Sequence, residues 1–137
     1  MEQHPVIGEK IFAKVPEYVE IAKVVRHHHE RVDGQGYPDG LVGEDTPLLS
    51  RIIAVADAYN AMTSDRPYRD AMPSHVARIR IGEGVGSQFD TGVVAAFEAI
   101  LAGASEDYRC GDGDAFALGY PALREVPAAP QLRVVAS

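Results

Sequence analysis

The chemically richest part of the sequence is a crowd of histidines and carboxylates near position 30. Three histidines, Glu30 and Asp33 fall within residues 27–33, and the turn-forming run Gly34-Gln35-Gly36-Tyr37-Pro38 follows. Imidazole and carboxylate groups together are ligands for zinc, iron and manganese. Adjacent helical side chains point about 100° apart, so neighbouring histidines either serve two adjacent ions, or one binds while the other supports it. The turn can place Tyr37 over whatever a metal binds.

Two residues far from this run could contribute to the same site. Asp57 lies within residues 52–59, the most apolar predicted helix. An unpaired buried carboxylate there would be costly, so it needs a cation, a metal or a proton. Arg66 or Arg69 could supply the cation, and histidines elsewhere in the chain make a metal the more economical partner. His4 by itself is also compatible with a simple N-terminal turn.

A second candidate cluster is cationic. Arg66 and Arg69 stand three residues apart and flank Tyr68. Such a cluster can grip a phosphate while the tyrosine packs, although a solvated loop with surface ion pairs has the same composition. The histidines at 27–29 have a similar alternative, since cationic side chains also suit a solvated helix C-terminus.

The apolar spacing predicts an all-α protein, with no strand-like alternation of useful length. We expect helices over residues 5–14, 17–29, 47–63, 74–81 and 91–102. The histidines should end the second helix. The third is apolar on most sides and should be the buried central helix, while Thr91 can cap the last. Residues 31–46 should form an ordered loop.

Composition limits the classes of partner. The chain has 137 residues and a net charge of −7, which argues against nucleic-acid polymers and anionic membranes but leaves room for a small phosphate ligand. Its single cysteine, Cys110, permits neither an internal disulfide nor a thiolate-rich zinc cluster and suits a cytoplasmic protein. No run of 18 apolar residues predicts a membrane span.

Taken together, these motifs resemble the C-terminal half of an HD-GYP domain, over about residues 3–101. The resemblance is carried by His28-His29-Glu30, Asp33-Gly34-Gln35-Gly36-Tyr37-Pro38, the run from Ala54 to Ser64, Arg66-Pro67-Tyr68-Arg69, His4-Pro5 and Gln88-Phe89-Asp90. It implies an all-helical, metal-dependent phosphohydrolase of the HD superfamily. Such domains hydrolyse cyclic di-GMP through pGpG and hold iron, manganese or similar divalent metals.

The resemblance also implies roles for individual residues. The metal ligands would be His4, His28, His29 and Asp57. Tyr37 would touch the nucleotide ligand, and Arg66 and Arg69 would meet its phosphates. The structural loop would be shaped by Asp33, Gly34, Gly36 and Pro38.

The domain organisation follows from the same comparison of motifs. We expect a partial HD-GYP domain over residues 1–102, truncated on its N-terminal side, and an irregular C-terminal tail over residues 103–137. The family's upstream His-Asp pair is missing, and the sequence contains no His-Asp dipeptide. We therefore expect hydrolysis by this chain alone to be impaired, because in-line hydrolysis uses a water activated by two metals.

Two further functional interpretations remain open at this level. The chain could be a catalytically inactive module that binds cyclic di-GMP, or a protein such as a diguanylate cyclase, through its Gly-Tyr-Pro loop. It could also be an unrelated single-metal binder. Without the family's upstream helices, the apolar helix over residues 47–63 should keep one uncovered face, which predicts either a homodimer or a tail that folds back.

Overall fold

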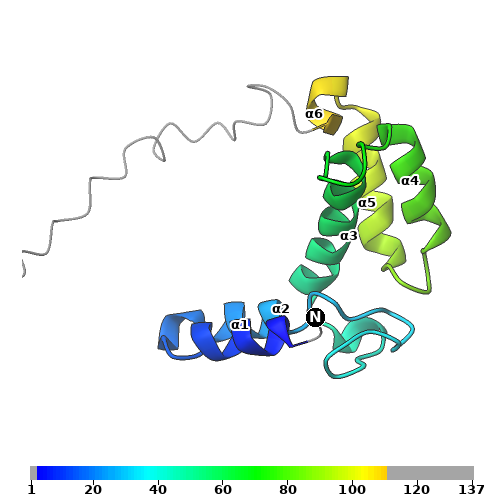
Figure 1. The fold of residues 1–137 in the computed structure, drawn as a ribbon. Helices are drawn as coiled ribbons and strands as arrows, with labels where there is room; N and C mark the ends of the chain where they lie inside the picture. The colour runs from blue at the N-terminus through cyan, green and yellow to red at the C-terminus, as the bar shows by residue number, and fades with distance from the viewer. Residues whose placement is uncertain (1–2, 111–137) are drawn as a thin grey trace, which may run out of the picture.

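The computed structural model describes residues 3–110, and every regular element in that range is helical (Figure 1). The elements are α1 (His4–Phe12), η1 (Pro16–Tyr18), α2 (Val19–Arg26), η2 (Gly43–Asp45), α3 (Leu48–Thr63), α4 (Ser74–Glu83), α5 (Thr91–Ala102) and α6 (Glu106–Cys110). The β-type pairings found within residues 3–110 are isolated bridges. The all-α prediction is therefore confirmed.

The helices form two groups. α1 and α2 pack against each other as a pair that lies across the N-terminal end of α3, whereas α3, α4 and α5 pack together along their lengths (Figure 1). The buried core belongs to the second group and consists of Val55, Tyr59, Ala77, Ile81, Phe89, Val94 and Leu101. The metal-ligand candidates near position 30 therefore lie at the junction between the two groups.

Helix α3 begins directly after Pro47 and ends at Thr63, as its sequence predicted. The prediction that it is buried on most sides is wrong. Its buried residues are Ser50, Val55 and Tyr59, while apolar side chains nearer its N-terminus are 41–59% exposed: Leu48, Leu49, Ile52 and Ile53. The reason is that α4 and α5 cover only one side of the helix.

Several helix ends differ from the sequence prediction by two or three residues, and two differences near the site matter. α2 ends at Arg26, so the three histidines lie in the turn that follows it rather than on its last turn. The α5 cap is Asp90 rather than Thr91, because Asp90 Oδ1 accepts the Val93 N–H at 2.9 Å. Arg51 donates to the other Asp90 oxygen at 2.6 Å, which ties the start of α5 to α3.

Helix α6 lies within the segment that the sequence left without regular structure. Its first turn is capped locally, since the Tyr108 N–H donates to Ser105 Oγ at 3.3 Å. The Tyr59 hydroxyl donates to the Arg109 carbonyl at 2.8 Å and fastens α6 to α3. The rest of the predicted tail lies outside the described residues, and the domain boundary at residue 102 stays a prediction. None of the helices within residues 3–110 is long and apolar enough to cross a lipid bilayer.

Candidate metal centre

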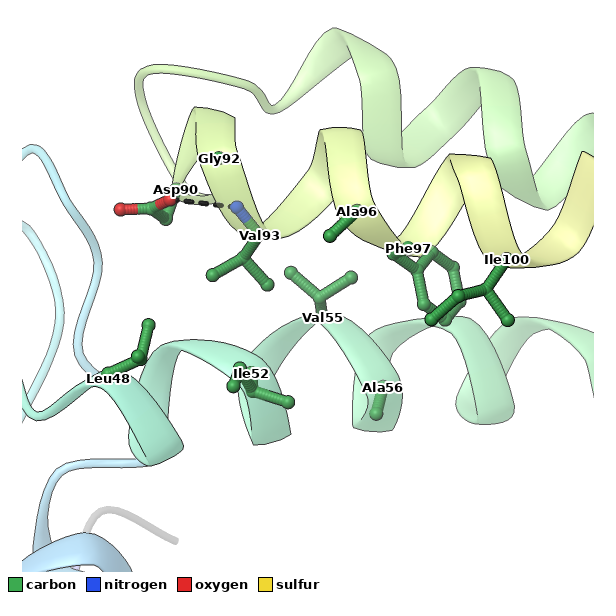
Figure 2. A pocket seen from close by; sticks show the side chains of 10 residues that line it. All are labelled: Leu48, Ile52, Val55, Ala56, Asp90, Gly92, Val93, Ala96, Phe97 and Ile100. Carbon is green, nitrogen blue, oxygen red and sulfur yellow. Dashed lines mark hydrogen bonds between the residues drawn. The ribbon is translucent and has the colours of Figure 1, made fainter.

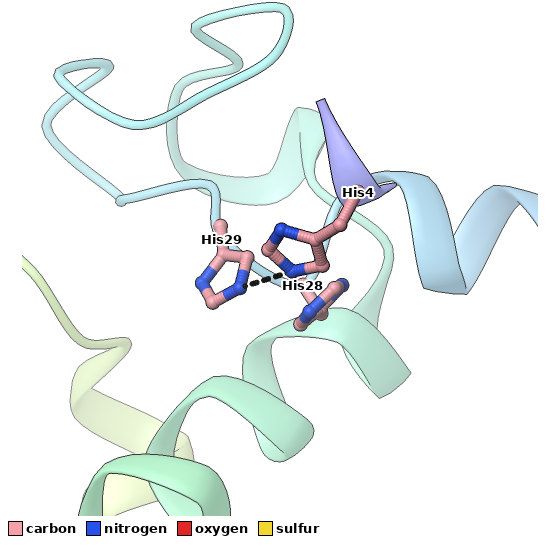
Figure 3. Close-up of side chains that lie close together, drawn as sticks. All are labelled: His4, His28 and His29. Carbon is pink, nitrogen blue, oxygen red and sulfur yellow. Dashed lines mark hydrogen bonds between the residues drawn. The ribbon is translucent and has the colours of Figure 1, made fainter. Parts of the chain in front are cut away.

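Three of the predicted ligands converge at the junction of α1, α2 and α3 (Figure 3). His4 is the first residue of α1, and His28 and His29 follow the end of α2, so the pairing of these helices brings them together. One nitrogen from each ring lies within 4.8 Å of the others. His4 Nε2 and His29 Nε2 are 3.0 Å apart. Since nitrogen-to-zinc bonds are about 2.0–2.1 Å long, both nitrogens can reach one ion, and the three rings fit a metal.

The histidines are also prepared electrostatically for binding. His28 Nδ1 lies 2.6 Å from the Val25 carbonyl, an acceptor that places the proton on Nδ1 and leaves Nε2 free. Burial lowers the pKa of His29, and electrostatic repulsion from His28 and His4 lowers it further. Asp57 acts in the opposite direction as the weakest contribution. A neutral imidazole is the form that ligates metals.

Asp57 lies on the wall of a cavity beside the three histidine rings, but it does not belong to the close group that these rings form. The cavity has a volume of about 230 Å³ and is lined by His28, His29, Glu30, Arg31, Ala54, Asp57, Ala58, Gln88 and Phe89. The expectation that Asp57 is buried is wrong, because its side of α3 is exposed. A solvated carboxylate at this place needs no compensating partner and remains available to an ion.

The Tyr37 ring lies against one of the three histidines. Its ring stacks on His29 with centroids 5.0 Å apart and planes inclined by 22°. Its backbone N–H donates to the His29 carbonyl at 3.3 Å. The peptide bond between Tyr37 and Pro38 is cis.

Two glycines and Asp33 have local geometry that suits this tight loop. Gly34 has a φ of +77°, which favours glycine. A Cβ at Gly36 would lie 2.5 Å from the Glu30 Cα, so a side chain there has no space. Asp33 Oδ1 accepts the Gln35 N–H at 3.0 Å, and Arg31 pairs with the same carboxylate. The Arg31 hydrogen bond, followed by that from Gln35, lowers the pKa of Asp33 to about 2.

Glu30 is a possible metal ligand by residue type, but in the structure its carboxylate binds backbone N–H groups of the loop. Its two oxygens accept the backbone N–H groups of Asp39 and Leu41, at 2.8 and 3.1 Å. The Asp39 carboxylate in turn contacts Arg26 at 2.7 Å and His27 at 2.9 Å. His27, Glu30 and Asp39 hold ligand atoms within 4.8 Å of one another. Protein donors already occupy the carboxylates of Glu30 and Asp39. This second group therefore stabilises the closed loop and is not a candidate metal site. Asp39 had no signal in the sequence beyond its place after the Gly-Tyr-Pro turn.

The two predicted phosphate-binding arginines do not enter the histidine cavity. They lie in the turn after α3, at the end of that helix away from α1 and α2 (Figure 1). Arg66 and Arg69 exchange backbone hydrogen bonds of 2.9 and 3.0 Å, and Arg69 also donates to the Ala61 carbonyl. With Tyr68, which is 87% exposed, they line a separate surface hollow of about 310 Å³.

A larger hollow lies between α3 and α5 and is mostly apolar (Figure 2). It has a volume of about 430 Å³, and Ile52, Val55, Val93 and Phe97 are among its lining residues. An apolar lining does not suit an anionic ligand. This hollow is therefore no part of the candidate metal centre.

Comparison with known proteins agrees with the fold and the motifs. A family model described as "HD domain" matches residues 1–116, and the chain belongs to the HD domain family. The cyclic di-GMP phosphodiesterase response regulator RpfG of Xanthomonas campestris is 40% identical over 114 residues, which are 81% of this chain and 29% of that protein. A cyclic di-GMP phosphodiesterase of Vibrio cholerae is 41% identical over 107 residues, covering 73% of this chain and 22% of that protein.

A solved structure shows the same fold. The crystal structure of the cyclic GMP-AMP-specific phosphodiesterase V-cGAP3 of Vibrio cholerae matches with a TM-score of 0.63 and 22% sequence identity, over 74% of this chain and 23% of that chain. The resemblance to the HD-GYP family and the HD-type helical fold are thus confirmed. The chain spans less than a third of the length of these relatives. Domains of this family are metal-dependent, and the three-histidine group supplies side chains that could hold an ion.

Proposed function

We propose that this chain forms the metal-binding part of a phosphodiesterase that opens a cyclic dinucleotide, with cyclic di-GMP as substrate and pGpG as first product. The observation that carries this proposal is the convergence of His4, His28 and His29, whose ligand nitrogens lie within 4.8 Å of one another. Asp57 lines the adjoining cavity and adds a carboxylate oxygen. Imidazole with carboxylate suits iron or manganese.

The relatives support the substrate class. Those from Xanthomonas campestris and Thermotoga maritima are named as cyclic di-GMP phosphodiesterases, and one from Vibrio cholerae as a 3'3'-cGAMP-specific phosphodiesterase. Both substrates are cyclic dinucleotides with two phosphodiester groups. Because the relatives are named for hydrolysis, the alternative of an inactive binding module is less favoured. A diguanylate cyclase partner at the Gly-Tyr-Pro loop stays a prediction.

The position of each residue suggests its role in the proposed reaction. His4, His28, His29 and Asp57 would hold a metal, which supplies an activated water or hydroxide for attack on phosphorus. Tyr37, stacked on His29, presents an aromatic surface beside the centre. Arg66 and Arg69 line a separate hollow after α3, where they would meet a phosphate group that lies away from the metal. Such local cations are needed because the chain carries a net charge of −7.

Metal binding and nucleotide binding test the proposal separately. Equilibrium dialysis of the 137-residue chain against Mn²⁺ or Fe²⁺ should show bound metal. Calorimetric titration with cyclic di-GMP should then show binding that depends on the metal. A chain that retains neither ion nor cyclic dinucleotide would exclude the proposed function. Binding of one ion without any nucleotide affinity would instead favour a single-metal binder.

A further inference from the structure

Glu30 occupies an unusual place beside the candidate metal centre. It directly follows His29 and is only 5% exposed. No salt bridge within residues 3–110 includes it. Its oxygens instead accept the N–H groups of Asp39 and Leu41, on the returning arm of the Gly-Tyr-Pro loop. A buried carboxylate without a cation is costly unless hydrogen bonds satisfy it. Glu30 receives these hydrogen bonds only when the loop is closed over it.

We infer that Glu30 is a positioning residue for the metal centre, which holds the Gly-Tyr-Pro loop closed and thereby keeps the Tyr37 ring against His29. This inference rests on the proposed metal role of His4, His28 and His29. Glu30 does not touch the ion or the substrate. It acts through the loop, on the orientation of one ligand.

The loop is tied to the ligand turn at three successive points. Gly36 passes against the Glu30 backbone, where a Cβ would lie 2.5 Å from the Glu30 Cα. The Tyr37 N–H reaches the His29 carbonyl at 3.3 Å, and the two rings stack. The third point is the clamp, which is the pair of hydrogen bonds from the Asp39 and Leu41 N–H groups to the Glu30 carboxylate. Loss of the clamp would free the return arm of the loop and, with it, the ring that faces His29.

The chemistry requires two acceptor oxygens at this position. A glutamine has the same shape but offers one acceptor oxygen, and its NH₂ group would face a backbone N–H instead of accepting from it. Glu30→Gln therefore removes one clamp bond while keeping the volume. Partners that orient a ligand from outside the metal shell typically change metal affinity about 10–100-fold when mutated.

The test uses the 137-residue chain and two variants that loosen the loop from opposite sides. Glu30→Gln weakens the clamp, and Gly36→Ala pushes the loop away from the Glu30 backbone. Glu98→Gln is the matched control, since Glu98 pairs with Arg78 at 2.6 Å on the distant α4–α5 contact. Each protein is examined without metal by amide hydrogen exchange and by nuclear Overhauser contacts between the His29 and Tyr37 rings. Each is then titrated with Co²⁺, whose visible spectrum reports the ligand geometry.

We expect the Asp39 and Leu41 amides to exchange about tenfold faster in Glu30→Gln, the ring contact to weaken, and Co²⁺ affinity to fall about 10–100-fold with an altered spectrum. Glu98→Gln should change none of these. Retained ring contacts despite faster exchange, or Co²⁺ binding equal to that of Glu98→Gln, would overturn the inference. If Glu30→Gln does not fold, Gly36→Ala decides by the same criteria. If the unmodified chain binds no Co²⁺, the proposed metal function fails, and the metal-free ring contact still decides the positioning role.

Discussion

The Tyr37 ring stacks on the His29 ring, with centroids 5.0 Å apart and an interplanar angle of 22°. This contact joins the loop that carries the Gly-Tyr-Pro turn to the turn that carries the candidate metal ligands. Its consequence is that loop conformation and ligand orientation are mechanically linked. Changes on either side should therefore be detectable at the other.

The first prediction concerns the ligand set. His29→Ala and Asp57→Ala should each lower Mn²⁺ or Fe²⁺ affinity at least about tenfold, because each removes a donor from the cavity wall. Equilibrium dialysis with elemental analysis measures the effect. His75→Ala is the control, since His75 is an exposed histidine on α4. Equal metal content in the unmodified chain and both site variants would contradict the assignment.

The second prediction concerns turnover. We expect this chain alone to hydrolyse cyclic di-GMP far below the median enzyme rate of about 10 s⁻¹. In residues 3–110 the tight group holds three imidazoles, which provide donors for one ion, whereas in-line displacement commonly uses two ions about 3.5–4 Å apart. Chromatographic detection of pGpG follows the reaction. Turnover near the median rate would show that the missing ligands come from another copy or from water.

The third prediction concerns phosphate binding. Arg66→Ala should weaken cyclic di-GMP binding by about tenfold, because a hydrogen bond to a charged group typically contributes about 1.5–3 kcal/mol. The difference should shrink at high salt, since the hollow around Arg66 is open to solvent. Arg80→Ala removes the same charge from an exposed position on α4 and should have little effect. Identical affinities for the two variants would remove Arg66 from the ligand site.

The fourth prediction concerns acid stability. The hydrogen bond from Arg26, assisted by His27, lowers the pKa of Asp39 from 3.8 to about 2. A carboxylate whose pKa is lower in the folded state stabilises the fold above its unfolded value, and this contribution disappears as the pH falls from about 4 to about 2. Asp39→Asn should therefore reduce the free energy of unfolding at pH 6 and have a smaller effect near pH 2.

Urea unfolding at a series of pH values checks this pH dependence. Asp70→Asn removes a carboxylate from an exposed position in the turn after α3 and serves as the control. A loss of stability in Asp39→Asn that is the same at pH 6 and pH 2 would show that the charge of the Asp39 carboxylate does not stabilise the fold.

The fifth prediction concerns assembly. We expect a homodimer through the uncovered face of α3, where Leu48 and Leu49 are 55% and 59% exposed. Leu49→Glu should shift light-scattering mass toward the monomer, because a charge would be buried in the contact. Ile79→Glu, on an α4 residue that is 61% exposed, should leave the mass unchanged. A monomeric unmodified chain at micromolar concentration that binds no hydrophobic dye would refute this expectation.

The sequence by itself determined the local elements and singled out the candidate ligands. Pro47 and the apolar spacing predicted the bounds of α3 to within a residue, because helix starts and hydrophobic periodicity depend on residues close together in the sequence. The glycines around Tyr37 predicted an ordered loop, because their conformations are local. The motifs also selected the three histidines that the structure brings together.

Only the tertiary structure decided burial and long-range pairing. Asp57 is exposed because α4 and α5 cover one side of α3, a fact of packing that no local pattern contains. Glu30 accepts N–H groups nine and eleven residues away, because the loop returns across it. Arg66 and Arg69 line another surface, because α3 carries them away from the histidines. Spacing along a chain determines which side chains share a helix face, whereas the packing of helices determines what that face meets.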